Sequence, residues 1–293
     1  MIISGSKGQK ARSNLVSKGS KYLLTPTSCD VIIWEWTWRN DMGRVIAIAN
    51  QKGGVGKTTT AINLSACLAE AGQRVLVIDI DPQGNTTSGL GVMKDDIDKT
   101  VYEVMLQEIE LTDAIIKNIF ENLDIVPSNV NLAGAEIDLI DVEDREYILK
   151  NEIAKVKGEY DYIILDCPPS LSMLTVNAMT ASDSVLVPMQ CEYYALEGLT
   201  QLIHTINLVK KKLNPELELE GVVFTMYDSR TNLSLQVVEN VKDNLNQTIY
   251  KTIIPRNIRL AEAPSHGLPI NIYDSRSAGA ESYRMLAQEV MSK

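Results

Sequence analysis

The sequence predicts a doubly wound α/β fold, in which a mostly parallel sheet is flanked by helices on both faces. Short apolar, β-branched runs alternate with helical patterns from residue 45 to the end of the chain. Most of these runs are almost continuously hydrophobic, as strands are when a parallel sheet buries them on both faces. Strand–helix alternation over about 250 residues indicates a single domain of this class.

Each element follows from its own local pattern. Between the first two apolar runs, apolar residues recur at helical spacing and predict a helix that begins near Thr58 and stops before Gly72. No internal repeat and no linker interrupts the chain after residue 42. The strands are expected at residues 45–50, 75–81, 123–128, 162–169, 184–190, 221–227 and 249–255.

Composition excludes several classes of protein. The 293 residues are 45% hydrophobic and 23% charged, which is ordinary for a water-soluble domain with a large core. No apolar run is long enough to span a membrane, and the four cysteines form no C-x-x-C pair. The two histidines lie far apart, so a His/Cys metal site is not expected. The net charge of −10 argues against a broad nucleic-acid surface but not against a local basic patch.

Residues 1–41 differ in character from the rest of the chain. They carry six basic and three acidic residues, all three tryptophans, and no sustained apolar period. At Met42 a start, a strand and a glycine-rich loop follow at once. We expect translation to begin at Met42, with the preceding stretch a mis-assigned start; a disordered tail or short docking segment is the alternative. Residues 42–293 are expected to form the functional domain.

The stretch "NQKGGVGKTTT" (residues 50–60) resembles a phosphate-binding loop with unusual spelling. The common pattern is G-x-x-x-x-G-K-[ST], and it lies between a strand and a helix, as here. Gln51 stands where the pattern asks for glycine, and Lys52 adds a second lysine. Glycines let the loop turn its backbone amides toward a di- or triphosphate at the helix N-terminus. We expect nucleotide binding by Lys52, Gly53, Gly54, Val55, Gly56, Lys57, Thr58 and Thr59.

Three acidic residues end two of the apolar strands. Asp79 and Asp81 alternate at the end of the second run, and Asp166 ends the fourth. The carboxyl ends of parallel strands are where open α/β sheets bind ligands. Lys57 is expected to pair with the β- and γ-phosphates, and the Thr58 hydroxyl and Asp166 to bind Mg²⁺ directly or through water. One of the two acids of the second run can orient an attacking water.

"KGGVGKTT", "VLVIDIDPQGN" and "YDYIILDCPPS", in that order, resemble the ParA/MinD ATPases, the deviant Walker A group of P-loop NTPases. The resemblance covers essentially Met42 to the C-terminus. Four later stretches are similar specifically to the chromosomal ParA proteins, which are called Soj in some bacteria. They are "LAGAEIDL" (132–139), "QCEYYALEGL" (190–199), "TMYDSRTNLS" (225–234) and "IPRNIRLAEAPSHGLPI" (254–270).

The resemblance implies ATP and Mg²⁺ as cofactors and an ATP-dependent homodimer. In this family the extra lysine, here Lys52, contacts the phosphates of the partner's ATP. Asp81 matches the water-activating acid, with Asp79 more suited to bracing the loop and the magnesium shell. The implied catalytic residues are Lys52, Lys57 and Asp81, and the implied Mg²⁺ residues are Thr58, Asp81 and Asp166. Additional nucleotide contacts are expected from Asp166, Met226 and Pro255.

The resemblance also implies nonspecific binding of double-stranded DNA by the dimer, in the cytoplasm on the nucleoid. A ParB-type centromere-binding protein is the expected partner that stimulates hydrolysis, and no membrane is expected to take part. Arg230 and Arg259 match positions that the family uses for DNA. Lys251, Arg256 and Lys242 are additional candidates.

Other functions of related proteins stay open at this point. A MinD-type, membrane-associated positioning ATPase needs a C-terminal amphipathic helix with a basic face, whereas Glu281 and Glu289 here oppose lipid headgroups. An electron-transfer protein like the nitrogenase iron protein needs two suitably placed cysteines, and only Cys167 lies near the site. Metabolic ATPases and a non-hydrolysing scaffold are further alternatives. The apolar stripe expected in a docked final helix is Tyr283, Leu286, Ala287 and Val290.

Overall fold

The structure is a computed structural model. It describes residues 43–192, 195–228, 230, 237–239, 241 and 249–293. The predicted extension 1–41, the predicted start at Met42 and the DNA candidate Lys242 lie outside these residues.

Within the described residues, eight strands form one sheet in the order β3-β4-β2-β5-β1-β6-β7-β8. All neighbouring strands are parallel except β3 and β4, which are antiparallel. All seven expected strands are present, so the doubly wound, mostly parallel fold is confirmed. They are β1 (Arg44–Ile48), β2 (Val75–Asp79), β4 (Leu123–Val126), β5 (Tyr162–Asp166), β6 (Ser184–Gln190), β7 (Glu218–Tyr227) and β8 (Ile249–Pro255).

The edge strand β3 (Ile116–Phe120) was not expected from the sequence. Its stretch "IKNIF" has exposed polar residues at its second and third positions and lacks the continuous apolar run of the buried strands. Asn118 also adopts a left-handed backbone with φ of 55°. An edge strand needs burial on fewer sides, and for that reason its sequence signal is weaker.

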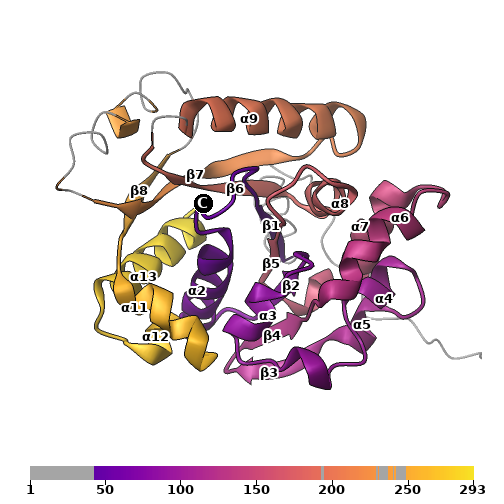
Figure 1. Ribbon diagram of the computed structural model, residues 1–293, viewed down its shortest axis with the longest axis horizontal. Coiled ribbons are helices and arrows are strands. Elements are labelled where there is room, and N and C mark those ends of the chain that lie inside the picture. Colours follow the sequence, from indigo (N-terminus) through magenta and orange to yellow (C-terminus); the bar gives the residue numbers. More distant parts are fainter. Residues whose placement is uncertain (1–42, 193–194, 229, 231–236, 240, 242–248) are drawn as a thin grey trace, which may run out of the picture. The chain divides into compact units, whose positions relative to one another are not determined.

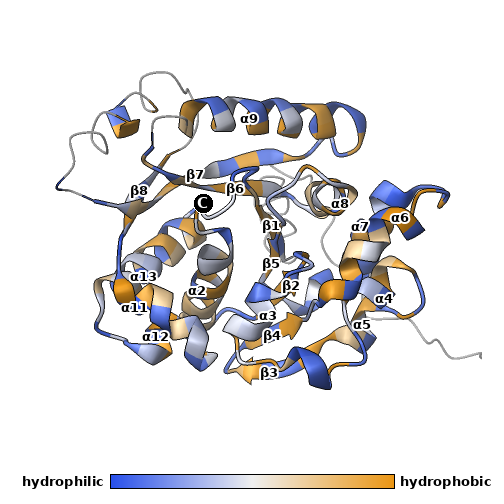
Figure 2. Ribbon diagram, viewed as in Figure 1, coloured by the Kyte–Doolittle hydropathy of each residue, from blue (hydrophilic) through white to orange (hydrophobic). Residues whose placement is uncertain are grey.

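Helices cover both faces of the sheet (Figure 1). Successive residues of β1 point to opposite sides, so that Val45 and Ala47 join one buried apolar cluster and Ile46 and Ile48 join the other. Apolar residues of α4, α7, α8 and α9 complete the first cluster, and those of α2, α11, α12 and α13 complete the second. Figure 2 shows the alternation of apolar and polar residues along α9, as expected of a helix with one face on the sheet.

The α-helices are short except for α2, α9 and α13. The predicted first helix is confirmed as α2, and Gly72 follows it in a left-handed conformation with φ of 86°. The bounds are α2 (Lys57–Glu70), α3 (Asn85–Gly89), α4 (Val101–Met105), α5 (Leu111–Ala114), α6 (Ala135–Asp138), α7 (Ile148–Val156), α8 (Met173–Ala181), α9 (Ala195–Lys212), α11 (Ile258–Glu262), α12 (Ile270–Tyr273) and α13 (Ala278–Met291).

The final helix α13 packs between α2 and β8. The Tyr283 hydroxyl lies 3.2 Å from that of Thr60 on α2, and both side chains are buried. The apolar stripe of the helix is therefore committed to the core and is not available to insert into lipid. No helix among the described residues combines the length and the apolar character needed to cross a membrane. The buried stripe consists of Tyr283, Leu286, Ala287 and Val290.

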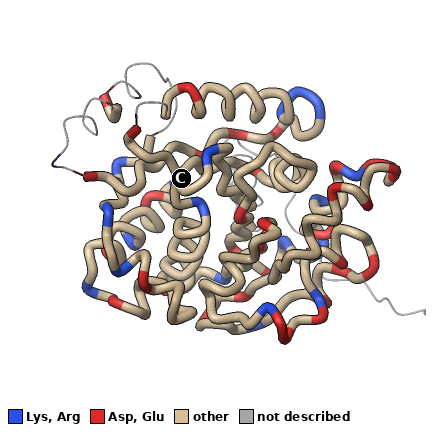
Figure 3. The backbone as a smooth tube through the Cα atoms, in the orientation of Figure 1, with Lys and Arg blue, Asp and Glu red and all other residues tan. Residues whose placement is uncertain are grey.

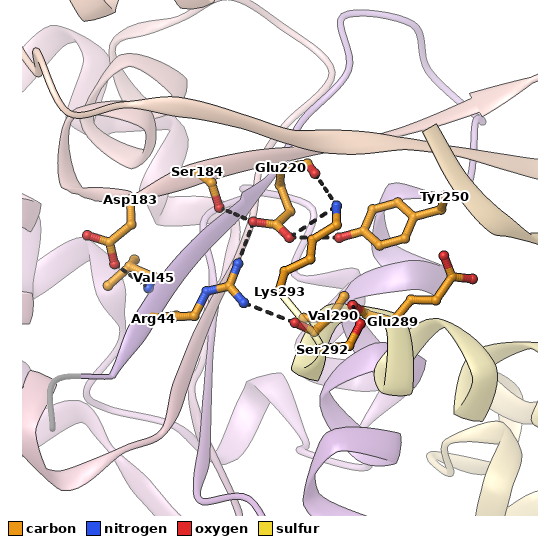
Figure 4. A network of polar contacts seen from close by, with 10 residues as sticks. All are labelled: Arg44, Val45, Asp183, Ser184, Glu220, Tyr250, Glu289, Val290, Ser292 and Lys293. Atoms are coloured by element: carbon orange, nitrogen blue, oxygen red, sulfur yellow. Dashed lines mark hydrogen bonds and ion pairs between the residues drawn. The ribbon is translucent and has the colours of Figure 1, made fainter. Parts of the chain in front are cut away.

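A buried carboxylate ties the C-terminus to the sheet at the end where β1 begins (Figure 4). The side chain of Glu220 accepts hydrogen bonds from Arg44 (2.7 Å), Ser184 (2.7 Å) and Tyr250 (2.8 Å). The Lys293 ammonium lies 3.6 Å from the same carboxylate and 3.9 Å from the Tyr250 ring centroid. These contacts join β1, β6, β7 and β8 to the end of α13 and leave the opposite end of the sheet for the site.

Candidate active site

The loop between β1 and α2 is held in shape by the neighbouring strands. Gly54 and Gly56 adopt left-handed backbone conformations with φ of 73° and 86°, which glycine accepts without steric cost. The Gly54 carbonyl accepts a 2.9 Å bond from the Gln190 side chain, and the Val55 carbonyl accepts a 2.8 Å bond from the Thr225 hydroxyl. With these carbonyl oxygens tied to β6 and β7, the loop's N–H groups and the N-terminus of α2 are candidates to bind phosphate.

Lys57 is the buried lysine of the loop. Its ammonium donates a 3.1 Å hydrogen bond to the carbonyl of Lys52, which folds the side chain back over the loop. Burial lowers the pKa of Lys57, and the nearby carboxylates Asp166 and Asp81 partly oppose that shift. A cation in this position, close to acidic groups and a ring of amides, can pair with phosphate oxygens.

The Asp166 carboxylate accepts hydrogen bonds from threonine hydroxyl groups of two helices, α2 and α3. Its Oδ2 accepts a 2.8 Å bond from Thr58 and a 2.7 Å bond from Thr86, whereas its Oδ1 is buried without a hydrogen-bond partner among the described residues. Burial and the neighbouring Asp79 raise the pKa of Asp166 to about 7. A buried carboxylate oxygen without a partner, beside a threonine hydroxyl, fits a divalent cation, whose charge would favour the ionised form.

Thr58 and Asp166 suit a cation that takes its remaining ligands from phosphate oxygens and water. Among the described residues, no group of three or more His, Cys, Asp or Glu is arranged to hold a metal ion. Mg²⁺ binds through one or two protein oxygens together with phosphate oxygens and water. Thr58 and Asp166 therefore suit Mg²⁺ that arrives with a nucleotide.

Asp79 and Asp81 have different surroundings. Asp79 is fully buried and accepts bonds from the Thr87 N–H (2.8 Å), the Thr87 hydroxyl (2.7 Å) and the Asp81 N–H (3.2 Å). Burial raises its pKa to about 6. Asp81 is 8% exposed and accepts a 2.9 Å bond from the Gln83 N–H. The contacts favour a bracing role for Asp79 and leave Asp81 as the acid nearer to solvent.

A cavity of about 190 Å³ opens beside the loop and contains the two outlying nucleotide candidates. Met226 and Pro255, at the carboxyl ends of β7 and β8, line it together with Gly56 and Thr59. Met226 adopts a left-handed backbone with φ of 49°, which is uncommon for a residue with a side chain. Both polar and apolar residues line the cavity, which suits a flat, partly apolar group such as a nucleotide base.

Lys52 is placed differently from Lys57. Its backbone N–H donates a 3.0 Å bond to the Asn50 side chain, but its side chain is 42% exposed and pairs with Glu192. The carboxylate that pairs with the additional lysine of the loop is therefore none of Asp79, Asp81 and Asp166. Sequence reasoning did not identify Glu192, although it lies two residues after the end of β6, as Asp81 lies two residues after the end of β2.

Three further residues of the site were missed. Thr86 and Thr87 donate to Asp166 and Asp79, and Gln190 holds the loop carbonyl of Gly54. Their signal was weak, because threonine and glutamine at loop ends are common. These residues can be assigned to the site only from the contacts that they make in the folded chain.

Four of the basic DNA candidates lie among the described residues, and each lies near an acidic residue. Arg230 is 84% exposed at its side chain and binds Asp228 through two nitrogens, and Arg259 is paired with Glu262. Arg256 lies beside Tyr227 at the carboxyl end of β8. Lys251 lies on the same strand, and its N–H donates to Glu289. The stretch 249–262, which forms β8 and α11 (Figure 3), carries Lys251, Arg256 and Arg259 and one acidic residue, Glu262 at its end.

The three cysteines in the described part of the chain are poorly suited to bind a cluster. Cys67, Cys167 and Cys191 are buried as free thiols. Burial raises the pKa of Cys67 to about 12 and that of Cys167 further. A thiolate ligand that bridges two subunits needs the opposite, an accessible and readily ionised cysteine.

Comparison with known proteins agrees with this geometry. The fold and site define a P-loop NTPase of the MinD/ParA class, and a family profile described as "AAA domain" matches residues 43–219. The chain belongs to the ParA/Soj family of chromosome-partitioning ATPases. It is 59% identical over 249 residues to the sporulation initiation inhibitor protein Soj of Bacillus subtilis, which covers 85% of this chain and 98% of that protein.

Two other similarities support the same conclusion. The chromosome partitioning protein ParA of Myxococcus xanthus is 52% identical over 252 residues, covering 86% of this chain and 89% of the relative. A crystal structure of cobyrinic acid a,c-diamide synthase from Mycobacterium smegmatis, with bound ADP and magnesium, aligns with a TM-score of 0.76. It is 41% identical and covers 85% of this chain and 94% of that one. The protein is an ATPase that uses ATP and Mg²⁺ and takes part in the segregation of a chromosome or plasmid.

Proposed function

We propose that this ATPase forms an ATP-dependent sandwich dimer that binds double-stranded DNA without sequence preference. A ParB-type centromere-binding partner then stimulates hydrolysis and releases the dimer from DNA. The proposal builds on the family, whose relatives include a chromosome partitioning protein ParA. It places the protein in the cytoplasm, on the nucleoid.

The observation that carries the proposal is the difference between the two loop lysines. Lys57 is buried and bonded to its own loop, whereas the Lys52 side chain is 42% exposed and its ammonium pairs with Glu192. One subunit thus offers a buried cation for its own nucleotide and an exposed cation for another. A cation delivered from a second subunit can neutralise charge on the transferred phosphoryl group.

Within one subunit we assign the remaining roles as follows. Lys57 and the loop amides bind the phosphates. Thr58 and Asp166 would hold Mg²⁺, which would supply positive charge to the phosphate oxygens. Asp81 orients the attacking water, and its partial exposure suits this task because water can reach it. Asp79 holds α3 and the Asp81 backbone in place. The cavity at Met226 and Pro255 receives the base.

DNA binding in this proposal depends on the pairing of two weak basic patches. In each subunit Arg230 and Arg259 are neutralised by Asp228 and Glu262, so a single copy attracts DNA weakly. Phosphates can exchange with these carboxylates, and a dimer doubles the number of contacts. Affinity should then fall steeply with salt.

To test the proposal, the ATPase rate of the protein is measured with Mg²⁺ under four conditions: the protein alone, with DNA, with a ParB-type partner, and with both. We expect a slow rate alone, because full charge compensation requires the dimer, and the largest increase with both partners. A fast rate that depends on neither the protein concentration nor the partners would contradict the proposal. Pelleting with liposomes gives the matching control for a membrane-bound mode of action.

A further inference from the structure

The exposed loop lysine has a specific partner in its own subunit. The Lys52 ammonium pairs with Glu192 Oε2, although 140 residues separate the two along the chain. Both side chains are about half exposed, at 42% and 53%. Among the carboxylates of the described residues, Glu192 is the one within ion-pair distance of Lys52.

The backbone on both sides of the pair is tied down. The Glu192 N–H donates to the Gln190 carbonyl (3.0 Å), and the Glu192 carbonyl accepts from the Ala195 N–H (3.0 Å) at the start of α9. The Gln190 side chain also binds the Gly54 carbonyl of the loop, and Asn50 holds the Lys52 N–H. Both backbone groups of Glu192 are therefore hydrogen-bonded where its carboxylate meets Lys52.

We propose that Glu192 is a positioning residue that retains Lys52 in its own subunit and opposes dimerisation until ATP is bound. This proposal rests on the proposed function, in which Lys52 contacts the partner's nucleotide. The γ-phosphate of that nucleotide carries more negative charge than one carboxylate and can displace it. Dimer formation then exchanges an internal ion pair for one between subunits.

The exposure of the pair suits such an exchange. A buried Lys–Glu pair would be costly to open, whereas a solvated pair contributes little and opens readily. Glu192 would thus adjust the concentration at which ATP dimers form without preventing them. Its removal should favour the dimer by roughly two- to fivefold, the range expected for one exposed ion pair.

The first test measures dimerisation by sedimentation with ATP and Mg²⁺, in an Asp81→Ala background so that ATP is not consumed. Glu192→Gln, which keeps the side-chain shape, should lower the dissociation constant of the dimer about two- to fivefold. The difference from the parent should narrow as salt rises from about 50 mM to about 500 mM, because salt screens the pair. Glu192→Asp should lie between the two.

The matched control is Glu197→Gln, which removes an exposed carboxylate from the first turn of α9 close to the same turn. It should leave the dimer constant unchanged. Lys52→Ala belongs in the same series, since it tests the function on which the proposal rests. If Lys52→Ala dimerises like the parent, the proposed function fails.

The second test examines the nucleotide-free monomer directly. Acetylation by acetic anhydride, followed by mass spectrometry, reports the reactivity of Lys52 relative to the exposed Lys211. The ion pair holds the Lys52 ammonium against the Glu192 carboxylate and so limits its contact with the reagent. Glu192→Gln should therefore raise Lys52 acetylation, whereas Glu197→Gln should not. Unchanged acetylation in Glu192→Gln would show that the pair does not hold Lys52.

The combined outcomes separate the two ideas. Increased acetylation together with a tighter dimer supports the proposal. A dimer constant that Glu192→Gln leaves equal or weakens overturns it, even if Lys52→Ala abolishes the dimer and the proposed function stands.

Discussion

The Thr58 hydroxyl, at the start of α2, donates a 2.8 Å hydrogen bond to Asp166 at the carboxyl end of β5. The other oxygen of Asp166 is buried without a partner among the described residues. The hydrogen bond links the loop and α2 to the end of β5. A cation that accompanies ATP can bind Thr58 and Asp166 together at this point.

Thr58→Ala should raise the Mg²⁺ concentration needed for half-maximal ATPase activity by about tenfold or more, because one oxygen ligand is lost. A Mg²⁺ titration of the hydrolysis rate measures this. Thr58→Ser keeps the hydroxyl and should restore the Mg²⁺ response. If the alanine variant responds to Mg²⁺ as the parent does, Thr58 is not a magnesium ligand.

Asp81→Ala should retain ATP binding and dimerisation but lower hydrolysis by about 100-fold or more, the usual contribution of a positioned general base. The protein should then stay on DNA. Single-turnover hydrolysis and sizing chromatography with ATP measure the two effects.

Asp79→Ala is the informative comparison, because Asp79 is buried and holds the Thr87 N–H and hydroxyl. Its loss should lower the free energy of unfolding by about 1–3 kcal/mol, since these donors lose their acceptor. If the Asp81→Ala variant hydrolyses ATP at the normal rate, Asp79 or another group, and not Asp81, activates the water.

Lys52→Ala should bind ATP as a monomer, since Lys57 and the loop amides remain, yet should fail to form the ATP dimer. DNA binding should be lost with it, because each monomer offers only half of the basic surface. Arg230→Ala should show the complementary result, with an intact dimer and lost DNA binding. Sizing chromatography and a DNA gel shift on both variants decide the matter.

Glu220→Gln should destabilise the fold by about 2–4 kcal/mol near neutral pH, because Arg44 then lies partly buried without its carboxylate. This loss of unfolding free energy is smaller than that expected for a fully buried ion pair, because the Arg44 side chain is 32% exposed. Urea denaturation of the variant and the parent measures the difference. Glu218→Gln removes an exposed carboxylate from the same strand and should cost little.

The same pair predicts the pH dependence of stability. Burial alone would raise the pKa of Glu220, but Arg44, together with Ser184, Tyr250 and Lys293, outweighs it and holds the pKa below its usual value. The stabilisation is therefore complete above the ordinary carboxyl pKa and is lost as the pH falls through the lowered one. The difference between Glu220→Gln and the parent should shrink between about pH 5 and about pH 3. A constant difference would exclude the charge of Glu220 as its cause.

Local patterns in the sequence are enough to predict seven of the eight described strands, the helix α2 and the phosphate loop. Each is encoded by neighbouring residues, as a continuous apolar run or as glycines before a lysine and a threonine. The sequence also identified Asp79, Asp81 and Asp166 as one group, because parallel strands place their carboxyl ends at the same edge.

The tertiary structure decided which of these groups meet. Asp166 bonds to Thr58 and Thr86, which lie 108 and 80 residues away along the chain, because β5 is inserted between β1 and β2 in the sheet. Lys52 meets Glu192 because β6 lies on the other side of β1. Strand order and side-chain pairing depend on packing between distant segments, which no local pattern encodes.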